Sequence, residues 1–274
     1  MSSTPGDLQR AFTGSIPSYY DRCLGPAWFG KIAEDLARRV PADPGGDVLE
    51  IACGTGLATR TLRERLDPRR RFVATDLNQS MLDVAMPKMA DLAGISWRTA
   101  DFARLPFENE SFAAVVCSLG VMFVPDRKGA FAQARRVLAP GGLFLFNVWD
   151  RAEENPCVRT YAEVIEGMFP GDKEMHFRLP FEMHDEGLLR GLLDGAGFTV
   201  RRLEKVRLPI EGVSAREIAT GQIRGTPRGA LLAQRGVDFD TAIDKVTAAL
   251  EKVGGEGAAF RSHCQVIVVE ALAG

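Results

Sequence analysis

The chain of 274 residues has little cysteine, little histidine and no surplus of positive charge. Its five cysteines are irregularly spaced, with no CxxC pair, and its three histidines form no cluster. These absences argue against a disulfide framework, a structural zinc site and any bound metal. A formal net charge of -2 also argues against a nucleic-acid partner, because proteins that neutralise phosphates usually carry a basic surplus.

Long apolar runs are absent as well. No run approaches the roughly 18 residues of a membrane-spanning helix. Residues 1–15, "MSSTPGDLQRAFTGS", lack the basic start and the apolar block of a signal peptide. We therefore expect a cytoplasmic protein without a membrane span. The hydrophobic share of 46% is enough for one full-sized core, and the oligomeric state stays open.

Up to about residue 150, short apolar runs alternate with helical patterns. The predicted strands are 47–52 (DVLEIA), 71–76 (RFVATD), 95–101 (ISWRTAD), 112–120 (FAAVVCSLG) and 142–149 (GLFLFNVW). The predicted helices are 57–66, 79–93 and 126–138, and a further helix, 28–40, precedes the first strand. Strand, helix and strand in this order predict a parallel sheet with right-handed crossovers.

The alternation breaks over residues 151–184, which contain three prolines. It returns with a helix at 185–197 and a strand at 198–208. Ser214 and Glu217 have the S-x-x-E spacing of a capping box, so a helix should begin near residue 215. The last elements that we predict are a helix at 238–255 and a strand at 264–272.

These patterns predict an α/β fold, namely a Rossmann-like, doubly wound, mostly parallel seven-stranded sheet with helices on both faces and a cap over the strand ends. We expect three parts in the chain. Residues 1–46 form an N-terminal helical arm, and residues 47–150 form the ligand-binding core. Residues 151–274 supply the cap insertions and the last two strands of the same sheet.

Two glycines and two acids indicate what this sheet binds. Gly54 and Gly56 follow the first strand of the core and precede a helix, where ligands of open parallel sheets sit. Glycine there lets the backbone turn sharply and approach a ligand. The next strand ends in Asp76, 20 residues after Gly56, and an acid at about this spacing typically accepts from both hydroxyls of a ribose.

Glu50, inside the first strand, argues against a dinucleotide. Its charge would repel a pyrophosphate, and Thr59 stands where a dinucleotide site has its third glycine. A carboxylate at this place would instead attract an amine. S-adenosylmethionine has an amine, a sulfonium and no phosphate, so Glu50 favours this cofactor over NAD.

Four motifs then resemble a known family. "VLEIACGTG", "FVATDLNQSMLDVA", "RTADFARLPFENESFAAVVCS" and "RRVLAPGGLFLF" are similar, in this order, to the motifs of the class I S-adenosylmethionine-dependent methyltransferases. The resemblance is greatest to the small-molecule branch that includes the ubiquinone and menaquinone methyltransferases. It covers about residues 17–150, and more loosely the stretch "LLRGLLDGAGF". It implies that the core binds S-adenosylmethionine and that the chain methylates an O, N or C atom of a small molecule.

The resemblance also implies roles for individual residues. The residues that would line the methionine part are Glu50, Cys53, Gly54 and Gly56, with Cys53 where the family usually has glycine. Those that would hold the adenosine are Asp76 at the ribose, Leu77 and Met81 at the adenine or ribose, and Asp101 and the Phe102 N–H at the adenine. Ser118 and Leu119 would face the sulfonium and the acceptor, and Tyr20, or else Tyr19, would close over the cofactor. For three of them a plain alternative stays open: Met81 as core, Asp101 as a turn residue, and Tyr20 as a surface aromatic.

The acceptor site is less defined by the sequence. His176 is our first candidate for a catalytic base, ahead of His184 and His263. Tyr161 ranks behind the histidines as a base and is also a candidate to contact the acceptor. Residues 190–235 hold nine basic and four acidic side chains. Arg224 or Arg228 is the first candidate there to meet an anionic acceptor, unless the stretch is only a solvated face.

Three other functions stay open. The first is the same chemistry on an RNA or protein acceptor, which would need an open face. The second is an NAD-type oxidoreductase, which would bind NAD rather than S-adenosylhomocysteine. The third is a catalytically idle binding module on the same fold, which would not need to keep the cofactor motifs.

Overall fold

A computed structural model describes residues 11–176 and 179–274 of the chain. The first ten residues of the predicted arm, and two residues of the predicted cap, lie outside this part. The strands are β1 (Val48–Ile51), β2 (Phe72–Asp76), β3 (Ile95–Thr99), β4 (Phe112–Ser118), β5 (Leu138–Trp149), β6 (Phe198–Ile210) and β7 (Ser262–Ala273). They form one sheet in the order β3-β2-β1-β4-β5-β7-β6.

The sheet is parallel except at β7, which runs antiparallel to both β5 and β6. β1 and β2 are buried along their whole length, as expected for parallel strands covered on both faces. The predicted fold class is confirmed. β5 begins at Leu138, before the predicted strand at 142–149. Leu138 already pairs with Phe112 of β4, and a bulge follows before Leu143 pairs with Ala114.

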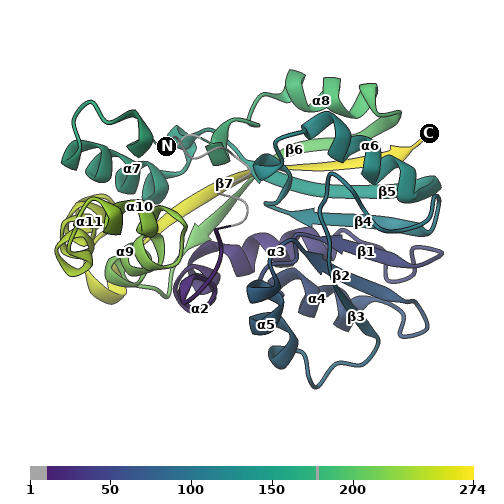
Figure 1. Ribbon diagram of the computed structural model, residues 1–274, viewed down its shortest axis with the longest axis horizontal. Helices are drawn as coiled ribbons and strands as arrows, with labels where there is room; N and C mark the ends of the chain where they lie inside the picture. The colour runs from purple at the N-terminus through teal and green to yellow at the C-terminus, as the bar shows by residue number, and fades with distance from the viewer. Residues whose placement is uncertain (1–10, 177–178) are drawn as a thin grey trace.

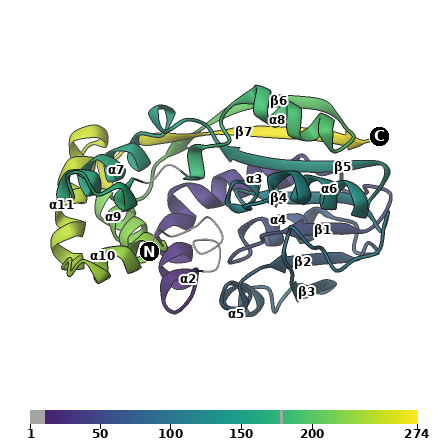
Figure 2. The same cartoon turned by 45° about the horizontal axis from the view of Figure 1, so that its top comes forward.

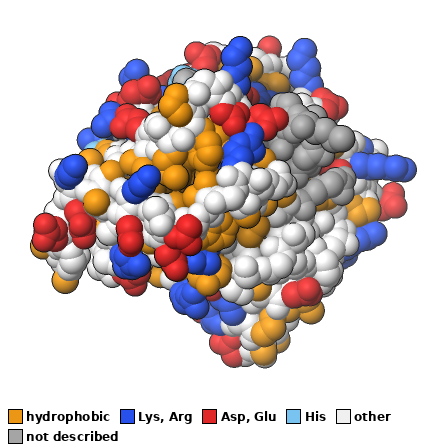
Figure 3. Space-filling model, turned by 60° about the vertical axis from the view of Figure 1, so that its left-hand side comes forward, with side chains coloured by type: hydrophobic (Ala, Val, Ile, Leu, Met, Phe, Trp, Pro, Cys, Tyr) orange, Lys and Arg blue, Asp and Glu red, His pale blue; other side chains and the backbone are white. Residues whose placement is uncertain are grey.

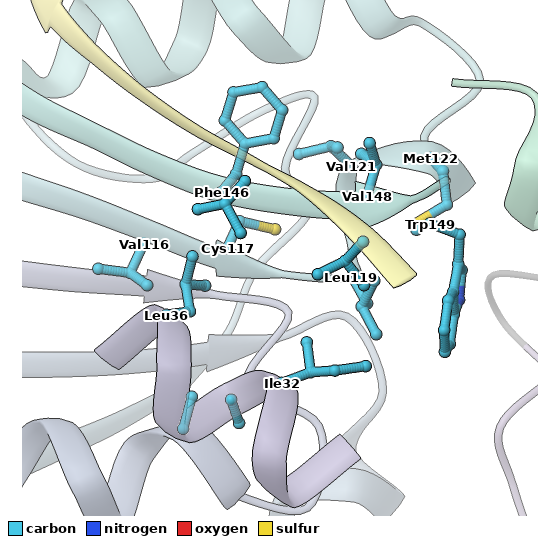
Figure 4. Close-up of a cluster of buried hydrophobic side chains, with 14 of the residues drawn as sticks. Ile32, Leu36, Val116, Cys117, Leu119, Val121, Met122, Phe146, Val148 and Trp149 are labelled. Atoms are coloured by element: carbon cyan, nitrogen blue, oxygen red, sulfur yellow. The ribbon is translucent and has the colours of Figure 1, made fainter. Parts of the chain in front are cut away.

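Helices cover both faces of the sheet. On one side, Phe131 of α6 (Arg127–Val137) packs edge-on against Phe146 of β5, with ring centres 5.4 Å apart. On the other side lie Ile32 and Leu36 of α3 (Gly30–Arg38), as Figure 4 shows. The remaining helices around the sheet are α4 (Leu57–Arg65), α5 (Gln79–Lys88) and α8 (Glu186–Gly195). This core fixes the ends of β4 and β5, from which Leu119 and Trp149 extend.

A group of helices stands beyond the carboxyl ends of the parallel strands (Figures 1 and 2). It comprises α7 (Pro156–Met168), α9 (Ala215–Arg224), α10 (Arg228–Gln234) and α11 (Phe239–Gly254), which we call the cap. α9 begins with the predicted capping box of Ser214 and Glu217. The segment α2 (Ile16–Tyr19) lies between the cap and the sheet.

The helix predicted at 28–40 differs from the structure. Its regular part is α3, and a ten-residue π-helix, η1 (Tyr20–Phe29), precedes it. Pro26 lacks an N–H, and the Gly30 N–H reaches back five residues to the Gly25 carbonyl. π-turns are rare and often lie at functional sites. Within residues 11–176 and 179–274, no helix is both long and apolar enough to cross a bilayer.

Candidate active site

A cavity of about 170 Å³ lies between the strand ends, η1 and the cap. Its walls are mainly apolar and aromatic, with Trp28 and Phe29 from η1, Trp149 from β5, and Phe181 from the segment before α8. The cavity therefore reaches from the sheet to the cap. An enclosed apolar cavity with a few polar groups is the usual form of a small-molecule site.

Asp76 supplies the negative charge of the sheet-side wall. Its side chain is 6% exposed, and its two oxygens accept hydrogen bonds from the backbone N–H groups of Gly54 and Asn78, each at 2.9 Å. Burial raises the pKa of Asp76, and these hydrogen bonds oppose the rise. A carboxylate oxygen can accept more than one hydrogen bond, so a diol could still donate to both oxygens.

A second cavity of about 40 Å³ adjoins the first and shares Tyr20, Gly54 and Leu119 with it. Glu50 lines this smaller cavity, and the Thr59 hydroxyl donates to its carboxylate at 2.7 Å. Burial raises the pKa of Glu50 to about 8, although the Thr59 hydrogen bond lowers it. Thr59 thus supports Glu50 where a dinucleotide site would have glycine.

These two cavities fit S-adenosylmethionine. The buried Glu50 carboxylate suits an ammonium group, and the Thr55 hydroxyl in the same cavity is buried without a hydrogen-bond partner. Gly54 has a φ of +57°, and a Cβ there would meet nothing within 4 Å, so the backbone leaves room for a ligand. The Asp76 carboxylate suits a ribose diol.

The twelve residues predicted at the cofactor occupy three kinds of position. Those that line the larger cavity are Tyr20, Gly54, Asp76, Leu77, Met81, Ser118 and Leu119. Glu50 and Cys53 line the smaller cavity. Gly56, Asp101 and Phe102 line neither cavity within the described part of the chain. The roles of all twelve residues at the cofactor stay predictions.

Gly56 has a packing reason instead. It is the left-handed residue before α4, with a φ of +83°, and a Cβ there would lie 2.9 Å from Met89 Cε and 3.2 Å from Ala85 Cβ. Phe102 packs against Phe144 with ring centres 6.5 Å apart. Asp101 follows β3 next to Asp76 and accepts from the Ala103 N–H at 2.9 Å. The described contacts of Phe102 and Asp101 therefore belong to the core and to a turn after β3.

Tyr20 and Cys53 have defined environments. Tyr20 stacks on Phe29 with ring centres 4.4 Å apart, so it is not a loose surface aromatic. Its pKa is raised, mainly by burial. Burial also raises the pKa of Cys53 well above the usual value, so this thiol stays protonated at neutral pH and is a poor nucleophile.

The cap-side wall carries four polar side chains, one of which, Thr226, lies between α9 and α10. Tyr161 comes from α7, Gln222 from α9 and Arg228 from the start of α10. Tyr161 was predicted as an acceptor contact, and Arg228 was the alternative to Arg224. The sequence prediction missed Gln222. Its signal is a lone polar residue on the buried face of α9, beside Ile218 and Ile223.

Two predicted acceptor-site residues lie elsewhere. The His176 side chain is 40% exposed, with Nδ1 3.2 Å from the Glu166 carboxylate. Arg224 pairs with Asp240 at 2.9 Å and lies over the Phe239 ring. Neither lines a cavity in the described part of the molecule. Their positions therefore argue against the predicted base and the predicted anion contact, because both side chains are turned to charged neighbours near the surface.

Metal ligands and further histidines do not gather at the site. Among residues 11–176 and 179–274, no group of three or more His, Cys, Asp or Glu is placed to hold a metal ion. Nδ1 of His184 is 2.6 Å from the Phe181 carbonyl oxygen, and His263 lies in β7 beside β6. The described lining of both cavities contains no histidine and no lysine.

Comparisons with known proteins agree with this site. A family model described as a methyltransferase domain matches residues 48–142. The ubiquinone/menaquinone biosynthesis C-methyltransferase UbiE of Saccharophagus degradans is 30% identical over 167 residues, which cover 56% of this chain and 67% of that protein. UbiE of Teredinibacter turnerae is 29% identical over 168 residues, covering 57% and 68%.

A solved structure supports the fold. Phosphoethanolamine N-methyltransferase 2 of Haemonchus contortus superposes with a TM-score of 0.55 at 16% identity, covering 92% of this chain and 56% of that one. The chain belongs to the class I S-adenosylmethionine-dependent methyltransferases, and S-adenosylmethionine is its cofactor. Within that class it is similar to UbiE, so the resemblance seen in the motifs is confirmed.

Proposed function

We propose that this methyltransferase acts on a small, planar, mainly apolar acceptor held in the larger cavity. One observation carries the proposal: Asp76 on the sheet side and Arg228 on the cap side line the same cavity. A cofactor on the sheet side and an acceptor on the cap side would therefore share one cavity. Quinone-ring precursors, the compounds that the names of the two UbiE relatives indicate, are the first class to test.

We assign the cofactor contacts as follows. Glu50 holds the ammonium group, and Asp76 accepts from the ribose hydroxyls. Cys53, Gly54 and Gly56 border the methionine part, Leu77 and Met81 pack on the adenine or ribose, and Asp101 and Phe102 extend the adenine side. Tyr20 covers the cofactor, and Ser118 and Leu119 separate it from the acceptor. The arm of residues 1–46 and the cap in residues 151–274 would cover the core of residues 47–150.

When bound, S-adenosylmethionine supplies a methyl group on a positively charged sulfur: the acceptor's electron pair bonds the methyl carbon, and the C–S pair stays on sulfur. The chain contributes position and exclusion of water. Trp28, Phe29 and Trp149 would keep a flat acceptor in place. Burial raises the pKa of Tyr161, so its phenol donates a hydrogen bond at neutral pH rather than taking a proton.

The alternatives fit the site less well. An RNA or protein acceptor needs an open face and, for RNA, a basic one. Six of the nine basic residues in 190–235 pair with carboxylates: Arg202 with Glu204, Lys205 with Asp150, Arg207 with Glu154, Arg216 with Asp244, Arg224 with Asp240, and Arg235 with Asp172. Figure 3 shows acidic and basic side chains intermingled around a central apolar area on the cap face. Glu50 and Thr59 argue against an NAD-type oxidoreductase, because Glu50 would repel a pyrophosphate and Thr59 stands where a dinucleotide site has glycine.

The test combines binding and turnover. We expect calorimetry to detect S-adenosylhomocysteine but not NAD. We expect 1,4-dihydroxynaphthalene, supplied without oxygen together with S-adenosylmethionine, to be methylated, whereas total RNA is not. Asp76→Ala should remove both binding and turnover. Methylation of RNA but of no small aromatic compound would overturn the proposal, and binding of NAD alone would return the oxidoreductase. An idle module would bind S-adenosylhomocysteine and methylate nothing.

A further inference from the structure

Four polar side chains line the cavity from the cap, the partly buried Thr226 and three buried ones. We call the buried three, Tyr161, Gln222 and Arg228, the cap triad. The other walls on this side are apolar, with Val158, Pro180 and further hydrophobic residues. Among the described residues that line the cavity, Arg228 alone carries a positive charge and Asp76 alone a negative one. Charge at the acceptor end therefore comes from a single side chain.

Two atoms of the cap triad are buried without a hydrogen bond to any residue in 11–176 or 179–274. They are the Tyr161 hydroxyl and Gln222 Oε1, in side chains only 1% and 3% exposed. The Thr226 hydroxyl is close enough to lower the Tyr161 pKa, but its own hydrogen bond goes to the Gln222 backbone carbonyl at 2.7 Å. Buried polar atoms of this kind are rare, because each one costs free energy.

The orientation of the Gln222 amide is fixed by a neighbour. Its Nε2 donates to the Cys157 carbonyl at 3.3 Å. A flipped amide would set its oxygen against that carbonyl, so Oε1 must be the atom left over. Gln222 therefore offers an acceptor to the site, whereas Tyr161 offers a hydroxyl donor.

Arg228 is held in place beside them. The side chain is 3% exposed, its Nη2 donates to the Met175 carbonyl, and its guanidinium lies 5.3 Å from the centre of the Tyr161 ring. Burial lowers the pKa of Arg228, while Tyr161 and Glu166 raise it. An arginine keeps its proton in proteins, so the guanidinium is a fixed positive charge in an apolar cavity.

We propose that the cap triad recognises an ionised oxygen of the acceptor together with a neighbouring hydroxyl. Arg228 and Tyr161 donate to the ionised oxygen, and Gln222 Oε1 accepts from the hydroxyl. The acceptor class is then a planar aromatic compound with an oxyanion and a hydroxyl on adjacent or nearby atoms. The inference rests on the proposed function, because it names what the acceptor carries at its far end. The described cavity lining contains no histidine or lysine that could take a proton. The positive charge of Arg228 would lower the pKa of an acidic group on the acceptor, so that the acceptor is ionised without a base.

The first test uses two probes of equal shape. Wild-type protein saturated with S-adenosylhomocysteine is titrated with 2-naphthoate and with 2-naphthamide, its neutral counterpart. We expect the naphthoate to bind at least about tenfold more tightly, because its hydrogen bonds are charge-assisted. Arg228→Met should abolish this preference and Tyr161→Phe should reduce it. Arg224→Met, which changes the neighbouring surface arginine, should leave it unchanged.

The second test concerns Gln222. In the wild type, 3-hydroxy-2-naphthoate should bind more tightly than 2-naphthoate, and Gln222→Met should remove that advantage. Equal affinities for naphthoate and naphthamide in the wild type would overturn the inference and leave the proposed function intact. Failure of both probes to bind would count against the proposed apolar acceptor itself. If Arg228→Met does not fold, as judged by lost S-adenosylhomocysteine binding, an unaltered preference in Tyr161→Phe still overturns the cap triad.

Discussion

The polar side chains at the two ends of the site differ in how far the protein itself supplies their hydrogen bonds. At the sheet end, Asp76 accepts from two backbone N–H groups and Glu50 accepts from Thr59. At the cap end, Tyr161 and Gln222 each keep a buried atom without a hydrogen bond. The protein itself therefore orients both carboxylates for the cofactor, whereas the acceptor end offers buried polar atoms to a ligand. Among the described residues around the two cavities, the Thr55 hydroxyl and the Trp28 indole N–H are also buried without a hydrogen-bond partner.

The two ends are also held differently. Strand pairing fixes the sheet end, since β1 pairs with both β2 and β4. The cap is joined to the arm by close packing of α9 on η1, where a Cβ at Gly221 would lie 2.5 Å from Leu24 Cδ2. At the end of α9, a Cβ at Gly225 would lie 2.7 Å from the Tyr20 backbone nitrogen. Small residues thus decide how closely the cap approaches Tyr20.

Asp76→Ala should have the largest effect and should be confined to the sheet end. It removes a carboxylate that we expect to accept two hydrogen bonds from the ribose, and it frees the Gly54 N–H. Loss of charge-assisted bonds should cost about 3 kcal/mol, or roughly a hundredfold in S-adenosylhomocysteine affinity. Calorimetry measures this directly. Asp83→Ala, which changes an exposed acid on α5 that accepts from the Gln79 side-chain amide at 2.9 Å, is the matched control. Unchanged affinity in Asp76→Ala would falsify its assignment to the ribose.

Gly225→Ala tests the contact between α9 of the cap and η1 of the arm. The added methyl would lie 2.6 Å from the Gly221 carbonyl oxygen and 2.7 Å from the Tyr20 nitrogen, and backbone atoms cannot easily move aside. We expect the free energy of unfolding to fall by about 1 to 3 kcal/mol, as overpacking usually costs. Urea denaturation measures the change.

The control for Gly225→Ala is Gly191→Ala in α8. A Cβ at Gly191 meets nothing within 4 Å, so the better helix propensity of alanine should stabilise this variant by about 0.5 to 1 kcal/mol. If both variants change stability in the same direction, the tight contact of α9 with η1 does not limit how the cap is seated.

Glu50 should make cofactor affinity depend on pH. Its pKa is about 8 in the folded protein, above the usual 4.5, so most of the carboxyl is protonated at pH 7. The ammonium group needs the ionised form. S-adenosylhomocysteine should therefore bind more tightly as the pH rises toward 8, by up to about tenfold per pH unit. Methylthioadenosine, which lacks the amine, should show no such rise, and Glu50→Gln should flatten the curve for S-adenosylhomocysteine.

The same group sets a stability trend without ligand. Between pH 4.5 and about 8 the unfolded side chain has lost its proton while the folded one keeps it. The free energy of unfolding should therefore fall as the pH rises through this window. Glu50→Gln should remove that fall. A wild-type protein that gains stability over the same window would contradict the raised pKa.

The sheet end was predictable because its signals are local. Strand lengths, Gly54 and the spacing from Gly56 to Asp76 are sequence features that the fold turns directly into neighbours. The role of Thr59 was not predictable in the same way. Its position suggested a missing glycine, and only the structure shows its hydroxyl on Glu50.

The cap end was harder because its residues meet through packing of distant segments. Tyr161, Gln222 and Arg228 come from three helices whose relative placement no periodicity gives. The π-helix was missed because the predicted helix began only at residue 28, after Pro26, and no helix was expected before it. The place of Trp28 in the cavity wall was missed with it. Arg224 and Arg228 lie one turn apart in sequence number, so their spacing alone could not tell which of them is buried.

His176→Ala should have the smallest effect and so sharpen the contrast between sequence and structure. The side chain is partly exposed beside Glu166 and lines neither described cavity, so it has no short path to an acceptor. We expect the rate of S-adenosylhomocysteine formation with 1,4-dihydroxynaphthalene to change less than about twofold, because a base must come within hydrogen-bond reach of the proton that it takes. Tyr161→Phe, assayed in parallel, should reduce the rate more, since it removes a donor inside the cavity. A tenfold loss in His176→Ala with an altered pH profile would restore His176 as the base and would mean that the segment after Met175 moves into the cavity during turnover.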